Sequence, residues 1–332
     1  MLVEGKGMEI PRRKFLQWTA GAAIFPALAP TARAENYPSR PVRLLVGFAP
    51  GGVTDITARL IGPWLSERLG QQFVIENRPG ASGNLAAETV ARASPDGHTL
   101  LLIAANNAYN ATLYDNLHFN FVRDIAPAAS ICRDYFVMVV NPAVPAKSVA
   151  EFIAYAKANR GRLNMGASGA GSGSQLYGEL FKAMTGVELA AVNYRGVGNA
   201  LPDLMAGRLD VIFIPVATAI GYVKAGTLRA LGVTAGQSLD VLPDVPPIGQ
   251  SVPGYEATGW TGIGVPAQTP PEFIAILNSQ VNAALADPTF KTRVSDLGMQ
   301  PFASSPAEFG KFIADYTDKW AKVIRTAGIK AE

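Results

Sequence analysis

The chain is poor in the side chains that build most disulfides and metal sites. Its 332 residues contain one cysteine, Cys132, and two histidines, His98 and His118. A single cysteine cannot form a disulfide within the chain, and so few thiol and imidazole groups argue against a His/Cys metal site. Cofactor motifs are missing as well, because the sequence has no P-loop and no G-x-G-x-x-G after a strand. We therefore expect neither a metal nor a cofactor.

An excess of one charge is also lacking once the first 34 residues are set apart. The whole chain has 29 Lys and Arg and 26 Asp and Glu; the first 34 residues hold five of the basic and two of the acidic ones, which leaves 24 of each. A neutral chain without a basic patch argues against a nucleic-acid partner.

Long apolar runs are missing too, and the N-terminus has the pattern of an export signal. Basic residues at 12–14 precede an apolar stretch, residues 18–28, and small residues follow up to Ala34. No segment reaches the roughly 18–20 apolar residues that a membrane-spanning helix needs. We predict that residues 1–34 are a twin-arginine-like signal peptide, cleaved near Ala34, and that the mature chain lies in the periplasm.

The stretch from Val42 to Leu60 predicts a buried strand, a glycine turn and an amphipathic helix. Gly51 and Gly52 form the turn, and Thr54 is predicted to cap the helix. Such a turn directs unpaired backbone N–H groups into one small volume, where the helix dipole adds positive potential. A carboxylate or phosphate is the natural guest. An ordinary tight turn without a ligand explains this motif equally well.

The rest of the mature chain predicts two α/β lobes. Three strand–turn–helix units up to the strand Thr99–Ala104 predict a parallel sheet with helices on both faces, where ligands bind beyond the strand ends. Ala105–Tyr109 is predicted as a polar loop. The glycine- and serine-rich segment 166–174 repeats the pattern predicted for residues 42–60, in which a strand is followed by a glycine turn, a capping residue and a helix. We predict one lobe from residues 35–136 and 255–332 and a second from 137–254, joined by crossover segments near 128–141 and 255–266.

The usual signs of an enzyme are absent. No serine has the G-x-S-x-G spacing, and a serine nucleophile needs a base, of which the two histidines offer few. The segment 167–174 does resemble a part of amidase-type hydrolases. We expect a binding protein, with a serine-dependent amidase-like hydrolase as the weaker alternative.

Several blocks together resemble one known family. Phe48-Ala-Pro-Gly-Gly-Val-Thr-Asp55 is similar to the F-x-P-G-G-x-x-D signature of the Bug/TctC proteins, the periplasmic substrate-binding subunits of tripartite tricarboxylate transporters. Glu76–Asn84, Ser94–Leu102 and Leu242–Pro246 resemble further family blocks in the same order. The similarity covers essentially the whole mature chain.

The resemblance implies a type II periplasmic-binding-protein fold, of class α/β, with two lobes around a cleft that holds a carboxylate. On the first side, the family's ligand-binding residues correspond to Phe48, Ala49, Pro50, Gly51, Gly52, Thr54 and Asp55. On the second side, they correspond to Ser168, Gly169, Ser172, Gly173 and Ser174. Because Asp55 is negative, we expect it to bind the turn backbone or a water, or to face a ligand amine.

Other candidates lie at further turns and strand ends, namely Asn84, Asn106, Asn107 and Arg195. Arg195 either pairs with the ligand carboxylate or is a solvated arginine at the rim. Many relatives have Asp-Asn where this chain has Ile214-Pro215. The missing acid disfavours an amino-acid ligand and favours a carboxylate with a more apolar body.

The predicted function is therefore the capture of a small carboxylate, such as a di- or tricarboxylate or an aromatic acid. The expected partners are this ligand and the membrane permease subunits of the tripartite tricarboxylate type, with the receptor itself a monomer. The same closed cleft also suits a second role, in which the loaded protein presents its ligand to a membrane sensor.

Overall fold

The computed structural model describes residues 37–329 apart from Asp115 and Ala170. The predicted signal peptide and its cleavage site lie outside these residues. The strands are β1 (Val42–Val46), β2 (Phe73–Asn77), β3 (Thr99–Ala104), β4 (Ile125–Val140), β5 (Asn164–Ala167), β6 (Ala190–Asn193), β7 (Val211–Pro215), β8 (Arg229–Val233), β9 (Thr258–Pro266) and β10 (Met299–Pro301).

Helices cover these strands. They are α2 (Val53–Leu69), α3 (Asn84–Ala91), α4 (Ala105–Leu113), α5 (Phe121–Asp124), α6 (Val149–Ala158), α7 (Gly173–Thr185), α8 (Val197–Met205), α9 (Val216–Lys224), α10 (Pro271–Ala286), α11 (Pro288–Asp296) and α12 (Pro306–Ala327), with short 3₁₀ turns η1 (Ala81–Gly83) and η2 (Ile248–Gln250).

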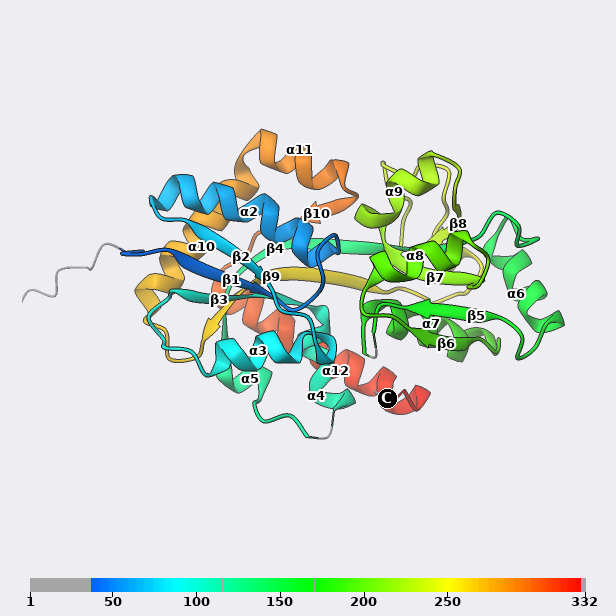
Figure 1. Ribbon diagram of the computed structural model, residues 1–332, viewed down its shortest axis with the longest axis horizontal. Coiled ribbons are helices and arrows are strands. Elements are labelled where there is room, and N and C mark those ends of the chain that lie inside the picture. Colours follow the sequence, from blue (N-terminus) through cyan, green and yellow to red (C-terminus); the bar gives the residue numbers. More distant parts are fainter. Residues whose placement is uncertain (1–36, 115, 170, 330–332) are drawn as a thin grey trace, which may run out of the picture. The chain divides into compact units, whose positions relative to one another are not determined.

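The strands run in the order β2-β1-β3-β9-β4-β7-β5-β6, and β8 and β10 also pair with β4 (Figure 1). The 16-residue strand β4 changes partners along its length. Its residues up to Tyr135 pair with β9, and those from Phe136 onward pair with β7 and β8. We call the strands before this change sheet A (β1–β3, β9, β10 and the start of β4) and those after it sheet B. The predicted lobe limits stay a prediction.

Sheet A is covered on both faces, which explains its continuous apolar strands. Leu44 and Val46 of β1 pack in a cluster with α2, α10 and α11, whereas Leu45 packs in another cluster with α3, α4 and α12. All three side chains are fully buried. Because successive residues of a strand point to opposite faces, only a run without polar residues suits such a sheet. The parallel pairing of β1 with β2 and β3 is as the sequence predicts.

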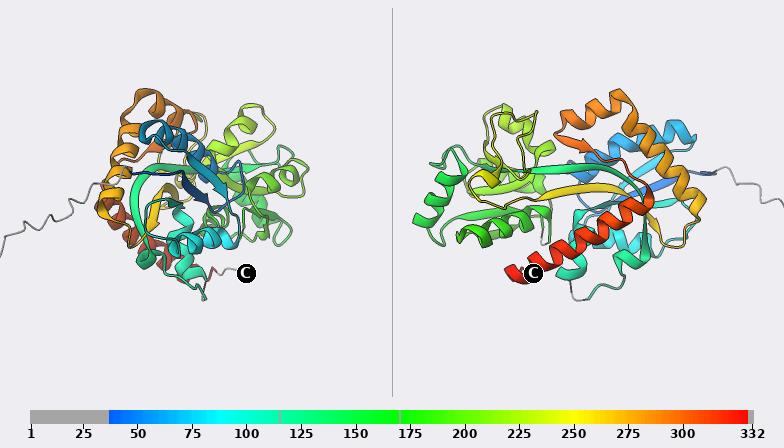
Figure 2. Two further views of the ribbon diagram at one scale, coloured as in Figure 1. Left: turned by 60° about the vertical axis from the view of Figure 1, so that its left-hand side comes forward. Right: turned by 180° about the vertical axis from the view of Figure 1, so that it is seen from behind.

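The helix α12 links the two halves of the structure. It packs against β4 and α4 on the side of sheet A and also against α7, which covers sheet B. Figure 2 shows it from behind, where it starts near one end of the long strands β4 and β9 and runs obliquely below them.

Two local predictions are wrong. The helix α2 begins at Val53 with Gly52 as its N-cap, so Thr54 lies inside the first turn and makes no cap hydrogen bond. Residues 105–109 are not a loop but the start of α4. The side-chain oxygen of Asn107 accepts the N–H of Ala104 at 2.9 Å. This hydrogen bond stabilises the first turn of α4, where the polar residues had suggested a loop. Ser148 caps α6, since its side-chain oxygen accepts the N–H of Glu151 at 3.2 Å.

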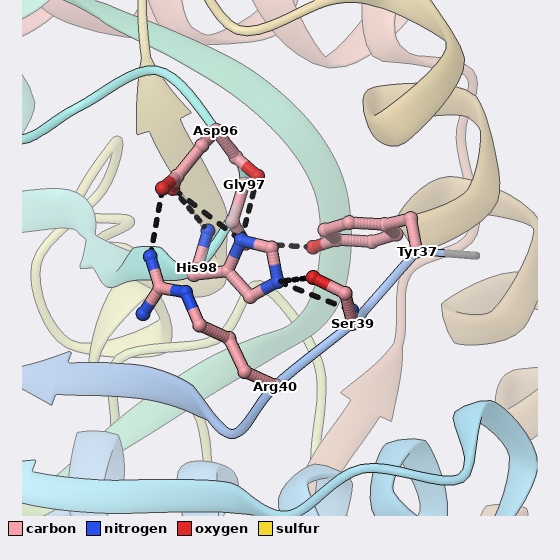
Figure 3. A network of polar contacts seen from close by, with 6 residues as sticks. All are labelled: Tyr37, Ser39, Arg40, Asp96, Gly97 and His98. Atoms are coloured by element: carbon pink, nitrogen blue, oxygen red, sulfur yellow. Dashed lines mark hydrogen bonds and ion pairs between the residues drawn. The ribbon is translucent and has the colours of Figure 1, made fainter. Parts of the chain in front are cut away.

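The first described residues are fixed to the turn before β3 (Figure 3). Tyr37 donates its hydroxyl to the carbonyl of Gly97 at 2.8 Å, and the Arg40 guanidinium pairs with Asp96 at 2.8 Å. Asp96 also accepts the backbone N–H of His98. This network holds the chain beside β3 just before β1 enters the sheet.

Candidate functional site

A pocket of about 740 Å³, including space open to solvent at its mouth, lies between residues of the two sheets and their helices. The turn between β1 and α2 lines one side, and the turn between β5 and α7 lines another. The crossover strands β4 and β9 contribute Asp134, Phe136, Gly259 and Trp260. Because segments far apart in the chain converge here, it is the strongest candidate for a ligand site.

The starts of five helices line this pocket. They are represented by Gly52 and Thr54 of α2, Asn106 of α4, Gly173 of α7, Val197 of α8 and Pro215 before α9. Each helix has at least nine residues. Helix N-termini carry unpaired N–H groups and the positive end of the helix dipole, so their convergence favours a negatively charged group inside the pocket.

One buried hydroxyl strengthens the case for a ligand. Thr54 is 4% exposed and lines the pocket, yet its Oγ1 has no hydrogen-bond partner among the described residues. Trp260 also lines the pocket, and its buried Nε1 likewise has no hydrogen-bond partner among the described residues. Because a buried polar atom without a partner costs about 1–3 kcal/mol, a ligand that accepts hydrogen bonds would relieve this cost.

The pocket has an aromatic wall. Phe136 and Tyr177 meet edge to face with ring centroids 4.7 Å apart, and Tyr109 and Tyr177 both pack against the indole of Trp320. Phe136, Tyr109 and Tyr177 all line the pocket. An apolar or aromatic ligand body would bury its surface against these rings.

Charged side chains are nearly missing from the described lining. Asp134 is its one Asp, Glu, Lys, Arg or His residue. Asp134 is 4% exposed, and burial raises its carboxyl pKa to about 7. Attraction for an anion therefore comes from backbone dipoles rather than from a basic side chain.

Asp55 does not line the pocket, and its carboxylate is hydrogen-bonded to neighbouring residues. Its carboxylate accepts the N–H of Gly51 at 3.0 Å, the Nε of Arg59 at 2.9 Å and the Nδ2 of Asn77 at 3.0 Å. Burial acts to raise its pKa, but hydrogen bonds from Arg59, Gly51 and Asn77 outweigh burial, and the pKa is lowered. The expectation that Asp55 binds the turn backbone is confirmed.

The structure brings together about half of the residues predicted from the sequence. Those that line the pocket are Phe48, Ala49, Pro50, Gly52, Thr54, Asn106, Ser168, Ser172 and Gly173. Those outside its lining are Gly51, Asp55, Asn84, Asn107, Gly169, Ser174, Arg195 and Ile214. Their roles as ligand contacts stay predictions.

Most of the second group have other tasks. Asn84 accepts a hydrogen bond from Asn110, and Ser174 accepts one from Ser168. Ile214 is fully buried in β7, whereas Arg195 is exposed. The lining residues that the sequence did not reveal include Tyr109, Asp134, Phe136, Tyr177, Asn199 and Trp260. Asn199 follows Gly196 and Gly198 at the start of α8, whereas the other five lie inside helices or strands away from any predicted glycine turn.

Two kinds of feature are absent from the described residues. No helix there is long and apolar enough to cross a membrane. No group of three or more His, Cys, Asp or Glu side chains in the same residues is arranged to hold a metal ion.

Two α/β halves joined by crossover strands, with a pocket between them, define a periplasmic-binding-protein fold. The chain belongs to the tripartite tricarboxylate transporter receptor family, TctC, whose model matches residues 57–329. It is therefore a transporter receptor, a binding protein rather than an enzyme. The family predicted from the sequence is confirmed.

Solved structures agree with this assignment. Rpa4515 of R. palustris, solved with adipate, is 37% identical over 89% of this chain and 99% of its own, with a TM-score of 0.86. The periplasmic binding protein BugD is 29% identical over 89% and 100%, with a TM-score of 0.85. MatC of Rhodopseudomonas palustris, solved with bound malate, is 32% identical over 87% and 100%, with a TM-score of 0.82.

Proposed function

We propose that the mature chain is a periplasmic receptor that binds a small carboxylate in the pocket between sheets A and B and delivers it to a tripartite tricarboxylate-type permease. The observation that carries this proposal is the convergence of five helix N-termini on a pocket whose described lining has no basic side chain. The unpaired hydroxyl of Thr54 adds a hydrogen-bond donor at the start of α2. The adipate and malate held by two relatives support a dicarboxylate.

The ligand body is less constrained than its charged end. Phe136, Tyr109 and Tyr177 favour an apolar or aromatic body, and Pro215 adds a further apolar residue to the lining. The absence of an acid at 214–215 argued against an amino acid. Asp134 weakens that argument, because it brings a carboxyl group to another wall of the same pocket.

A thermal-shift screen of the mature protein tests the proposal. Adipate, malate, benzoate and aspartate are added singly, after the protein has been unfolded and refolded to remove any acid trapped from the host. A ligand at 100 times its Kd adds about 2.7 kcal/mol to the free energy of unfolding, a shift of several degrees. No shift with any acid, and no acid in the denatured extract, would overturn the carboxylate assignment.

A pair of threonine variants locates the site. Thr54→Val removes the unpaired hydroxyl in the pocket, and the lost hydrogen bond to a charged ligand weakens binding by about 10- to 100-fold. Thr218→Val is the matched control, because its buried Oγ1 is also unpaired but Thr218 does not line the pocket. Calorimetric affinities that fall equally in both variants would exclude a direct contact with Thr54.

A further inference from the structure

Asp134 is a buried carboxyl group in the pocket lining to which the proposed function assigns no role. It lies on β4 opposite Gly259 of β9, one residue before the last pair between these strands. A Cβ atom at Gly259 would overlap the Asp134 carboxyl, so glycine at this position leaves room for the acid. The side chain is 4% exposed, and Asp134 lines the pocket.

The groups that face Asp134 from neighbouring elements supply no positive charge. They are Tyr109 of α4, Tyr177 of α7, Tyr316 of α12 and Cys132 of β4. Burial raises the pKa of each of these groups, so all four stay neutral at pH 7. They can accept or donate hydrogen bonds, but they cannot neutralise a carboxylate.

The nearest residues in sequence do not compensate either. The guanidinium of Arg133 lies over the rings of Phe302 and Phe312, at 4.6 and 5.4 Å from their centroids. Tyr135 donates its hydroxyl to the side chain of Gln300 at 2.8 Å. No described residue forms an ion pair with Asp134 within 4.0 Å.

We propose that Asp134 couples capture of the carboxylate ligand to the uptake of one proton, so that the filled pocket holds Asp134 in its neutral, hydrogen-bond-donating form. This inference rests on the proposed function. A ligand carboxylate and an ionised Asp134 would place two negative charges in one desolvated volume. One proton from solvent removes that repulsion and supplies an O–H donor for the ligand.

Thermodynamic linkage fixes the sign of the effect. Without ligand the carboxyl pKa is about 7, and a bound anion raises it further. Well below pH 7 the free protein already carries the proton, and the affinity depends little on pH. Above pH 7 each binding event must draw a proton from solvent, so Kd rises by up to about tenfold per pH unit. A ligand ammonium paired with ionised Asp134 would reverse this sign.

Titration calorimetry with adipate measures the uptake directly. Wild-type protein is titrated between about pH 6.5 and 8.5, where both adipate carboxyls are ionised in solution, in two buffers of different ionisation enthalpy. We expect close to one proton taken up per adipate near pH 8 and a Kd that rises with pH. Asp134→Asn should bind adipate without proton uptake and with a Kd independent of pH.

Histidine controls assign the proton to Asp134, because histidine is the residue type that most often exchanges a proton near neutral pH. Neither lines the pocket, so His98→Gln and His118→Gln should keep the wild-type uptake. If Asp134→Asn fails to fold, Asp134→Ser takes its place. Adipate binding with no proton uptake, or with uptake that survives removal of Asp134, would overturn the inference and leave the proposed function standing. Failure of every acid to bind would instead count against the proposed function.

Discussion

Two buried carboxyl groups lie in different elements, Asp55 in the first turn of α2 and Asp134 on β4. They are 3% and 4% exposed, yet the pKa of Asp55 is lowered and that of Asp134 is raised to about 7. Asp55 accepts hydrogen bonds from Gly51, Arg59 and Asn77, whereas no described cation faces Asp134. The hydrogen-bond partners, together with the depth of burial, decide whether such an acid keeps its charge.

Asp55 and Asp134 therefore have different roles. An ionised Asp55 holds the turn that presents the start of α2 to the pocket. Asp134 has no structural partner of opposite charge, and it lies where a ligand can reach it. Four substitutions test this difference between Asp55 and Asp134.

Asp55→Ala should have the largest effect on folding. It removes the acceptor of the Gly51 N–H, one of the two acceptors of the Asn77 Nδ2, which also donates to the carbonyl of Phe48, and the acceptor of the Arg59 Nε. With three hydrogen bonds to a charged group lost, we expect a loss of about 3–5 kcal/mol in the free energy of unfolding at pH 7. Because the folded pKa is lowered, this stabilisation is present above the unfolded pKa of about 3.9 and is lost as pH falls below it. Urea unfolding at several pH values measures both effects, and a loss independent of pH would contradict the account.

Asp134→Asn should do the opposite and stabilise the folded protein at neutral pH. The folded pKa of about 7 lies above the unfolded one, so wild-type stability falls as pH rises from about 4 to 7. The variant lacks this penalty, and its advantage should grow over that window to roughly 2–4 kcal/mol. A thermal-shift series over pH checks it, and an equal or lower Tm at pH 8 would show that Asp134 has a stabilising partner.

Gly259→Ala tests the room left for the Asp134 carboxyl. The added methyl group would overlap that carboxyl, and overpacking of this kind costs about 1–3 kcal/mol. Combined with Asp134→Ala, the same change should cost much less, because the clash is gone. A double-mutant cycle by denaturant unfolding measures the coupling; purely additive losses would place the strain elsewhere.

Arg59→Met should have the smallest effect. The Arg59 side chain is 55% exposed, and a pair with one solvated partner contributes about 0.2–1 kcal/mol. Asp55 keeps its hydrogen bonds from Gly51 and Asn77, so the turn should survive. A fall in Tm as large as that of Asp55→Ala would show that the ion pair, not the backbone contact, holds the turn.

The sequence was informative where a local pattern carries the function. The run from Leu44 to Gly52 predicts β1 and the glycine turn because apolar strand residues and glycines act within a few positions of one another. The segment 166–174 likewise predicts the turn that precedes α7 and the start of that helix. Both turns line the pocket.

The rest of the site depends on contacts between distant segments. Asp134 resembles any polar residue in a strand until β4 is seen to pass from one sheet to the other. Tyr109 was hidden because residues 105–109 were interpreted as a loop, although Asn107 starts a helix there. Tyr177 and Trp260 belong to apolar patterns that the core alone would explain.

In the proposed function, helix N-termini hold the carboxylate without a basic side chain among the described lining residues. Calorimetry with adipate and with its neutral diamide, at about pH 6.5 where Asp134 is largely protonated, tests it most directly. The account predicts that adipate binds at least about 100-fold more tightly, since charged hydrogen bonds and helix dipoles contribute only for the anion. Equal binding of adipate and the diamide would contradict it.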